Sequence, residues 1–288
     1  MRIVELSNHP QHLLAAEAER RERERAEREA RHRQAREGHA EKVAQLSERR
    51  SEARLYRRPF AWLGATLALW QLRSRRPARA APPPGTAAAA LHKREQLAAG
   101  VHGEQLLANE LSEELDDDWT LFRGYRNRHG EIDHLLLGPP GLIAIEVKYR
   151  NATVSCDGDD WTYVKCDRYG NEVEVGDLCD GAGRSPSEQL NEPADALEQF
   201  LASRGQQLEI ERVLIFNHPR AELDEISEPT VDVDTEAETI FELVEEMDGD
   251  LSADRLARIE KLIMRDHHFN ERRLHARARN WLCVTTRP

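Results

Sequence analysis

The sequence predicts an α/β protein, with a central mixed β-sheet flanked by helices and preceded by a long charged N-terminal helix. Between residues 91 and 216, a segment of helical apolar spacing leads into several short apolar runs, a second helical segment and a further apolar run. A Pro/Ala-rich stretch separates this region from a charged one before it. With 288 residues, the chain is long enough for one good-sized core and an appendage.

Residues 11–58 predict one long, charged helix. Glu precedes Arg by four positions five times, as in Glu17/Arg21 and Glu24/Arg28, and this order stabilises a helix face. Most apolar positions are alanine, so a heptad seam is poor before about residue 40. A solvated helix, a weak coiled coil and a nucleic-acid contact through the Arg-rich face all stay open.

Residues 59–72 form an apolar run of 14 residues between arginines. A membrane-spanning helix needs about 20 apolar residues, so this run is short. Trp62 and Trp70 near its ends are typical of an anchor at a membrane interface. Burial against a partner or another copy of the chain explains the run equally well, and membrane association is the less favoured interpretation.

Four regions follow from these patterns. We expect a charged helical arm over residues 1–76, a semi-rigid Pro/Ala linker over 77–90, and a folded domain over 91–220. Residues 221–288 hold an acidic stretch, about 221–250, and C-terminal helices that pack on the domain or extend it. Helices are expected at 91–115, 186–203, 253–266 and 270–281, and strands at 119–125, 132–137, 142–149, 153–155, 161–165 and 211–216.

Charge is distributed unevenly along the chain. The net charge is -12, but residues 1–100 hold 21 Lys+Arg against 12 Asp+Glu, a net charge of +9, and residues 101–288 hold 20 against 41, a net charge of -21. Because an acidic domain repels phosphate, the basic arm is the more natural contact with nucleic acid. The four cysteines show no CxxC spacing, which favours free thiols over a zinc site, and no secretory signal is visible. We therefore expect a cytoplasmic protein.

The most informative segment is HGEIDHLLLGPPGLIAIEVKYR, residues 129–150, which predicts a β-hairpin with a Gly-Pro-Pro-Gly turn. Side chains alternate along a strand, so Glu146 and Lys148 share one face of the second strand. Leu137 should lie opposite Leu142, which places Asp133 opposite approximately Glu146. Two carboxylates and a lysine would thus meet at one end of the sheet.

Two carboxylates held this close need a positive charge between them, and a hard divalent cation fits. Asp133 and Glu146 would bind Mg²⁺ or Mn²⁺, and the metal would polarise a phosphate and acidify a water. Lys148 would orient or deprotonate that water, or stabilise the developing charge. A structural ion pair is the alternative, because Glu-x-Lys occurs often by chance. His134 points away from Asp133, which favours packing or support over catalysis.

The same segment resembles the nuclease-related domain, a branch of the PD-(D/E)xK phosphodiesterase superfamily. The residues that carry the likeness occur in order: Gly103, Glu104, Ile132, Asp133, His134, Gly138, Pro139, Gly141, Glu146, Lys148 and Tyr149. Trp161 is similar to a tryptophan of the family's next hairpin, and Ser185-Pro186-Ser187-Glu188-Gln189 resembles its Asn-Pro-x-x-Gln element with serine in place of asparagine. The strand before Asn217-His218-Pro219 also resembles a family strand, so the likeness covers about residues 95–220.

The resemblance implies a restriction-endonuclease-like fold and a Mg²⁺- or Mn²⁺-dependent endonuclease, with DNA as its nucleic-acid partner. It adds Glu104 as a further acidic and metal-binding residue, and it places Gln189 near the site. Catalytically silent proteins share the superfamily's fold. The alternative is therefore a non-cleaving module that binds nucleic acid or protein, with self-association through the N-terminal helix or attachment to the inner face of the membrane.

Overall fold

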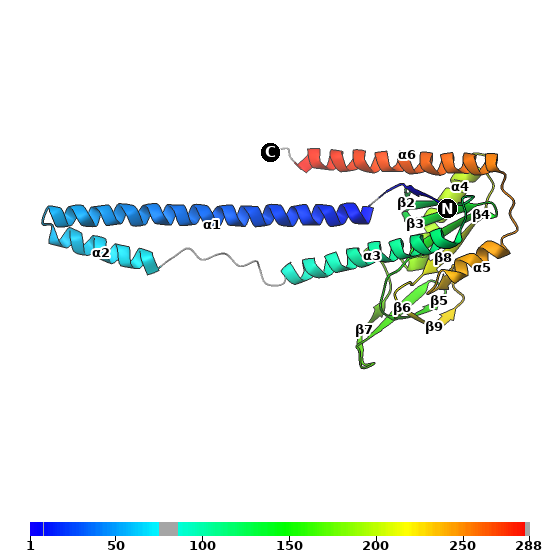
Figure 1. The fold of residues 1–288 in the computed structure, drawn as a ribbon, viewed down its shortest axis with the longest axis horizontal. Coiled ribbons are helices and arrows are strands. Elements are labelled where there is room, and N and C mark those ends of the chain that lie inside the picture. Colours follow the sequence, from blue (N-terminus) through cyan, green and yellow to red (C-terminus); the bar gives the residue numbers. More distant parts are fainter. Residues whose placement is uncertain (8, 75–85, 286–288) are drawn as a thin grey trace. The chain divides into compact units, whose positions relative to one another are not determined.

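The computed structural model describes the backbone of residues 1–7, 9–74 and 86–285 (Figure 1). The chain forms two compact units. One comprises residues 13–95, and the other combines residues 1–12 with residues 96–288. Residues 77–85 of the expected linker at 77–90 lie outside the described residues. Residues 86–90 belong to a helix.

The first unit is a helical hairpin. Helix α1 (His9–Leu55) carries the Glu/Arg pairs, and α2 (Pro59–Ser74) contains the apolar run. The two helices pack against each other, because His39 of α1 donates a hydrogen bond from Nε2 to the carbonyl oxygen of Leu72, 2.8 Å away. Leu69 is buried on the packed side of α2.

No helix among the described residues is long and apolar enough to cross a membrane.

A six-stranded sheet forms the centre of the second unit, in the order β1-β2-β3-β4-β8-β10. Its strands are β1 (Arg2–Glu5), β2 (Thr120–Arg126), β3 (Glu131–Gly138), β4 (Gly141–Val147), β8 (Ile210–Ile215) and β10 (Asp232–Asp234). The β2-β3-β4 meander is antiparallel, whereas β1, β8 and β10 pair in parallel. The sheet is therefore mixed, as the sequence predicts.

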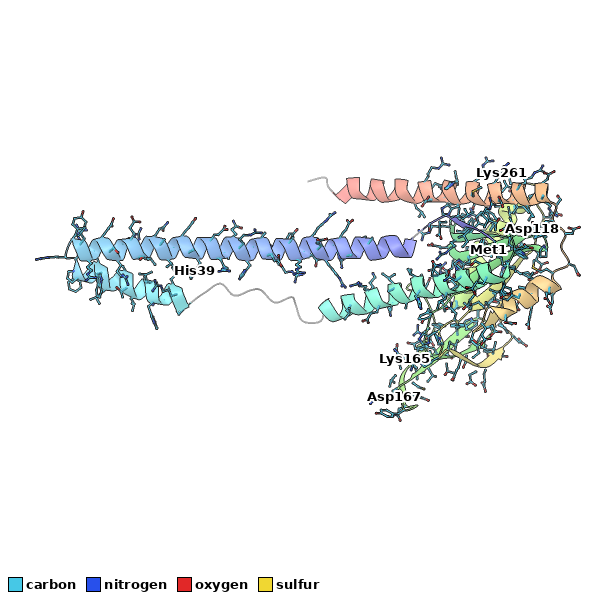
Figure 2. All side chains as sticks on the ribbon, viewed as in Figure 1. Met1, His39, Asp118, Lys165, Asp167 and Lys261 are labelled. Atoms are coloured by element: carbon cyan, nitrogen blue, oxygen red, sulfur yellow. The ribbon has the colours of Figure 1, made fainter. Side chains whose placement is uncertain are left out.

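A second, four-stranded sheet has the order β7-β6-β5-β9. Its strands are β5 (Thr153–Asp157), β6 (Asp160–Cys166), β7 (Glu172–Asp177) and β9 (Glu222–Ser227). The prediction of one sheet is corrected here. The strands at 153–155 and 161–165 do form, but β5 pairs in parallel with β9 from the acidic stretch and not with the main sheet. Lys165 and Asp167 lie toward the far end of the β6–β7 hairpin (Figure 2).

Helices cover both faces of the main sheet. They are α3 (Thr86–Glu114), α4 (Pro186–Ala202), α5 (Glu238–Glu246) and α6 (Ala253–Thr285). Residues of α4 and α6, such as Leu197 and Ile263, bury themselves in the core on one face. Residues of α3 and α5, such as Leu107 and Ile240, fill a separate core on the other. The result is a layered α/β arrangement, as in Figure 1.

The C-terminal region differs from expectation. The two helices predicted at 253–266 and 270–281 are one continuous helix, α6. No glycine or proline separates them, and Ile259, Ile263, His267 and Asn270 keep one buried face across the expected break. The side chain of His267 on this helix is fully buried.

Strands β1, β7, β9 and β10 and helix α5 have no counterpart among the predicted elements. Strand β1 is four residues long and lies within the range assigned to the arm, yet it pairs with β2 at the edge of the main sheet. Strands β9 and β10 carry the sequences ELDEIS and DVD, so acidic residues conceal their strand character.

Candidate functional site

The β3–β4 hairpin brings the predicted site residues to one end of the sheet. Leu137 pairs with Leu142 and His134 with Ile145, so the next position along β3, Asp133, lies beside Glu146. The backbone confirms this proximity, because the N–H of Val147 donates a 2.9 Å hydrogen bond to Oδ2 of Asp133.

Strand β4 divides its side chains between the two cores. Ile143, Ile145 and Val147 pack in the core covered by α3 and α5. Leu142 and Ala144 pack in the core covered by α4 and α6, and strand alternation puts Glu146 on this second side. Glu146 is only 7% exposed. A carboxylate in this position is costly without a partner.

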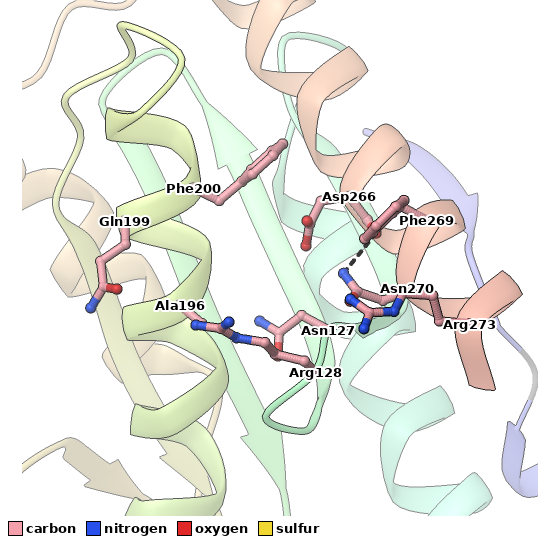
Figure 3. A pocket seen from close by; sticks show the side chains of 9 residues that line it. All are labelled: Asn127, Arg128, Ala196, Gln199, Phe200, Asp266, Phe269, Asn270 and Arg273. Atoms are coloured by element: carbon pink, nitrogen blue, oxygen red, sulfur yellow. Dashed lines mark hydrogen bonds between the residues drawn. The ribbon is translucent and has the colours of Figure 1, made fainter. Parts of the chain in front are cut away.

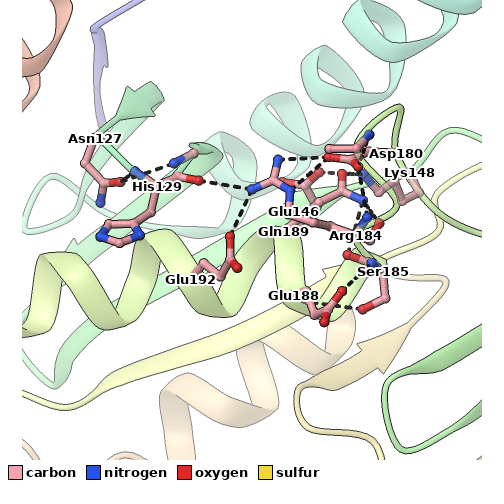
Figure 4. Close-up of polar contacts among 12 residues, drawn as sticks. Asn127, His129, Glu146, Lys148, Asp180, Arg184, Ser185, Glu188, Gln189 and Glu192 are labelled. Atoms are coloured by element: carbon pink, nitrogen blue, oxygen red, sulfur yellow. Dashed lines mark hydrogen bonds and ion pairs between the residues drawn. The ribbon is translucent and has the colours of Figure 1, made fainter. Parts of the chain in front are cut away.

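Lys148 supplies that partner. Its Nζ lies 2.5 Å from Oε1 of Glu146 and donates a second hydrogen bond to Oε1 of Gln189, 3.0 Å away. The structure thus joins the lysine that follows β4 to Gln189 of α4, the residue that the resemblance placed near the site. Figure 4 shows Glu146, Lys148 and Gln189 pointing toward one another from a strand end and a helix.

A capping box determines where α4 begins and therefore where Gln189 sits. The hydroxyl of Ser185 accepts a hydrogen bond from the N–H of Glu188, and the Glu188 carboxylate accepts one from the N–H of Ser185. Pro186 follows the cap, which suits the first turn of a helix. Ser185 therefore performs a capping function. Gln189 Nε2 donates to the carbonyl oxygens of Arg184 and Ser185 and so keeps Oε1 aimed at Lys148.

Helix α3 presents Glu104 to the same region, and Gly103 allows the close approach. A Cβ at Gly103 would lie 2.7 Å from Cβ of Tyr149 and 2.9 Å from Oδ1 of Asn217. Asn217 also donates from Nδ2 to the Gly103 carbonyl oxygen at 2.8 Å, which ties the helix to the residues after β8. The Gly-Glu pair therefore combines tight packing with a carboxylate at the sheet end.

His134 supports the same helix from the other face of β3. Its ring is fully buried, and Nε2 donates to the carbonyl oxygen of Glu104 at 3.1 Å. Burial, with a smaller contribution from the charge of Arg123, lowers the pKa of His134 to about 4. The imidazole is therefore neutral at physiological pH, and it positions Glu104 without exchanging protons there.

Two of the site carboxylates, Asp133 and Glu104, have raised pKa values. Burial is the main cause that raises the pKa of Asp133 well above its usual value, and the nearby charges of Glu146 and Glu104 raise it further. Burial likewise raises the pKa of Glu104 to about 7, although Arg123 opposes the change. Burial alone would lower the pKa of Lys148, but Glu146 and Asp133 hold it above its ordinary value. The neighbouring carboxylates thus favour the charged form of Lys148.

Arg123 is a residue that sequence reasoning missed. It is buried in β2 opposite His134, and its Nη1 donates to Oε1 of Glu5 at 2.8 Å and to Oε1 of Gln105 at 3.0 Å. The sequence does carry a sign of this residue, because a charged arginine interrupts the apolar run LFRGY in the same way that Glu146 interrupts LIAIEV. Its charge offsets part of the carboxylate repulsion around Glu104.

The donor set at the sheet end fits a hard divalent cation. Asp133, Glu146 and Glu104 offer carboxylate oxygens, and their mutual repulsion favours a bound positive charge. In the described part of the chain, however, these three do not bring their oxygens within 4.8 Å of one another. A cation bound by all three would therefore have to draw the carboxylates together.

One other cluster brings potential ligand atoms within 4.8 Å in the described chain, formed by His267, His268 and Glu271 on α6. Nδ1 of His267 accepts a 3.1 Å hydrogen bond from the N–H of Arg126. A neutral ring with an accepting Nδ1 carries its proton on Nε2, the nitrogen that faces Glu271. His267 therefore cannot offer a lone pair to a metal there. Cys156, Cys166 and Cys179 carry free thiols.

Of the comparisons with known proteins, the one with protein families gives a match. Residues 99–217 match the family described as the nuclease-related domain. No curated protein and no solved structure shows significant similarity to the chain. The matched range contains every residue placed at the sheet end, from Glu104 on α3 to Asn217 after β8.

Proposed function

We propose that this chain is a divalent-metal-dependent nuclease that hydrolyses phosphodiester bonds of DNA. The proposal starts from the match of residues 99–217 to the nuclease-related domain. The observation that carries the proposal is the meeting of Asp133, Glu146 and Lys148 at the end of the β3–β4 hairpin. A buried Glu146 and a half-buried Asp133 beside a lysine are costly for folding, and such arrangements are typical of functional sites.

Each residue has a role that follows from its position. Asp133 and Glu146, with Glu104 from α3, would hold Mg²⁺ or Mn²⁺, and such an ion supplies Lewis acidity toward a phosphate and a water. The carboxylates of Glu146 and Asp133 raise the pKa of Lys148 against the effect of burial, which favours a role as a cation that stabilises charge on the phosphate oxygens over a role as a base. Gln189 positions the ammonium through its 3.0 Å hydrogen bond.

The test is a cleavage assay with the full chain on plasmid and oligonucleotide DNA, with Mg²⁺ or Mn²⁺ and with EDTA. We expect metal-dependent cleavage that falls at least about 100-fold in Asp133→Asn and Lys148→Ala. Lys261→Ala is the matched control for the lysine, because it removes an exposed lysine on α6 and should retain full activity. Metal-independent cleavage, or cleavage that persists in both site variants, would refute the proposal.

A specific observation supports a second role for the N-terminal unit, attachment to an anionic lipid surface. Phe60, Leu63, Leu67 and Trp70 lie along one face of α2 at helical spacing, and Phe60 and Trp70 are 87% and 69% exposed. Arg57 and Arg58 precede the helix and Arg73 lies in its last turn, so cations flank the apolar face. We propose that this face lies in the headgroup region of an anionic membrane.

Co-sedimentation with vesicles tests this second role. We expect the chain to bind phosphatidylglycerol vesicles and to bind pure phosphatidylcholine vesicles weakly. Phe60→Ala with Trp70→Ala should abolish the difference, whereas the control Leu91→Ala, an exposed leucine on α3, should not. If the chain binds neither kind of vesicle but forms dimers that depend on Phe60 and Trp70, a second copy of the chain covers this face.

A further inference from the structure

A pocket of about 290 Å³ lies between α4, the β2–β3 turn and α6, away from the carboxylates of the site. Figure 3 shows Phe200 of α4, Arg128 of the turn, and Asp266, Phe269 and Arg273 of α6 around it. Pockets for drug-sized ligands hold about 300–1,000 Å³. This one therefore has room for a single small planar group.

The rim of the pocket combines an aromatic ring with cations. Phe269 is 51% exposed, although it lies on a helix whose opposite face is well buried. The guanidinium of Arg273 lies 5.6 Å from the centre of the Phe269 ring, and Arg128 is exposed on the facing turn. An accessible ring beside a guanidinium is the arrangement on which nucleobases stack.

The floor of the pocket offers a hydrogen-bond acceptor. Oδ2 of Asp266 accepts a 2.6 Å hydrogen bond from the hydroxyl of Tyr125, and Nδ2 of Asn270 donates to the backbone carbonyl oxygen of Asp266. The Tyr125 contact holds the carboxylate in place, and no hydrogen bond from another described residue reaches Oδ1. That oxygen can accept a hydrogen bond from the exocyclic amino group of adenine, cytosine or guanine.

Helix α4 connects the pocket to the candidate nuclease site. Gln189 contacts Lys148, and Ala196 and Phe200 line the pocket on the same helix. At 1.5 Å per residue, these positions lie about 10–16 Å apart along the axis. One strand of a DNA duplex advances about 3.4 Å per nucleotide, so the separation corresponds to a few nucleotides.

Hydrogen bonds follow the same path at the surface. Arg184, whose carbonyl oxygen binds Gln189, donates from Nη1 to the carbonyl oxygen of His129. The N–H of His129 in turn donates to Oδ1 of Asn127, which lines the pocket. Figure 4 shows this series of contacts from Lys148 to Asn127. A series of hydrogen bonds therefore joins the site to the pocket.

We propose that the pocket binds one unpaired base of a single-stranded nucleic acid, a few nucleotides from the phosphate at the Asp133–Glu146–Lys148 site. The base stacks on Phe269 beside Arg273, and its amino group donates to Asp266. A base inside a duplex cannot enter, because its faces are stacked and its amino group is paired. The inference rests on the proposed nuclease function, since it identifies the form of substrate that the site receives.

Binding of fluorescein-labelled 12-mers to the full chain tests the proposal by anisotropy in EDTA, where metal-dependent cleavage does not occur. The probes are single-stranded dA, dC and dT, the RNA oligomer of A, and a blunt DNA duplex. We expect the single strands to bind more tightly than the duplex, and dA and dC more tightly than dT. Phe269→Ala should weaken single-strand binding about tenfold, within the range for loss of one base–aromatic stack.

Two matched controls lie on the same helix. Leu274→Ala removes another exposed apolar side chain, and Arg265→Ala removes the same charge as Arg273→Ala at an exposed position outside the pocket. We expect Phe269→Ala and Arg273→Ala to weaken single-strand binding while both controls leave it within about twofold. Phe269 is half exposed, so its replacement should preserve the circular dichroism spectrum.

Three results would overturn the proposal: no single-strand binding, equal affinity for single strand and duplex, or equal losses in the pocket variants and their controls. The binding assay and the cleavage assay distinguish the failure of the base pocket from the failure of the nuclease function. If the binding pattern holds but no cleavage occurs with Mg²⁺ or Mn²⁺, the nuclease function is wrong and the base pocket stands. If cleavage occurs but Phe269→Ala changes neither affinity nor rate, the base pocket is wrong and the nuclease stands.

Discussion

Replacing Glu104 by glutamine should stabilise this protein at alkaline pH. The folded state holds the Glu104 proton more tightly than the unfolded chain does, because burial and neighbouring carboxylates raise the pKa from 4.5 to about 7. Stability falls as pH rises wherever the folded state binds more protons than the unfolded state. Ionised Glu104 therefore destabilises the fold above pH 7, and this destabilisation disappears as the pH falls toward 4.5.

The expected magnitude follows from the same pKa. One pKa unit corresponds to about 1.4 kcal/mol, so the change at Glu104 sets an upper limit of about 3 kcal/mol. The side chain keeps partial contact with solvent, which reduces the effect. We expect Glu104→Gln to raise the free energy of unfolding by about 1–3 kcal/mol at pH 8 and to leave it nearly unchanged at pH 4.5.

Urea unfolding with EDTA, followed by tryptophan fluorescence, measures this difference. Trp119 and Trp161 are buried in the second unit, whereas Trp62 and Trp70 of the helical hairpin are exposed, so the emission shift reports mainly on the second unit. Mg²⁺ should stabilise the wild type more than the variant at pH 8, because the ion replaces the lost proton.

Glu113→Gln is the matched control, since Glu113 is an exposed residue of the same helix. If Glu104→Gln and Glu113→Gln change the free energy of unfolding equally at pH 8, or if Glu104→Gln is destabilising there, the folded state does not raise the pKa of Glu104 as described above.

Three further outcomes follow from the structure. Gly103→Ala would place a Cβ 2.7 Å from Cβ of Tyr149, so it should lower the free energy of unfolding in urea by about 1–3 kcal/mol. Gly100→Ala is the control, because its Cβ would meet no atom within 4 Å, and it should be neutral or stabilising. Equal effects of the two substitutions would contradict the tight contact at Gly103. Mg²⁺ affinity measured by calorimetry should be at least about tenfold weaker at pH 6 than at pH 8, because binding must displace the proton of Glu104. The difference should shrink in Glu104→Gln. An affinity that does not change with pH would show that this carboxylate is not a ligand. Tyr125→Phe removes a hydroxyl that donates a 2.6 Å hydrogen bond to Asp266 on α6, so it should lower the free energy of unfolding by about 1–3 kcal/mol. Tyr169→Phe, at an exposed tyrosine, is the control and should have no such effect. Identical unfolding curves for Tyr125→Phe and the wild type would show that this hydrogen bond does not stabilise the fold.

The sequence was sufficient for the β3–β4 hairpin and its register. Proline and glycine define the turn, the apolar alternation sets the faces, and together they bring Asp133 beside Glu146. These determinants are local, because each involves residues within about 20 positions of the others. The long α1 helix and the capping box at Ser185 are local for the same reason.

Only the tertiary structure decided the features that depend on distant segments. Strand β1 pairs with β2 across more than 100 residues, and β9 completes a second sheet with β5 from within an acidic stretch. Short, charged strands carry little periodic signal, since their pairing depends on the partner strand and not on their own pattern. The packing of Gly103 against Tyr149 and the pocket between α4 and α6 have the same origin. The local sequence thus determined which residues carry the chemistry of the proposed site, and long-range packing determined how Glu104 and Gln189 reach them.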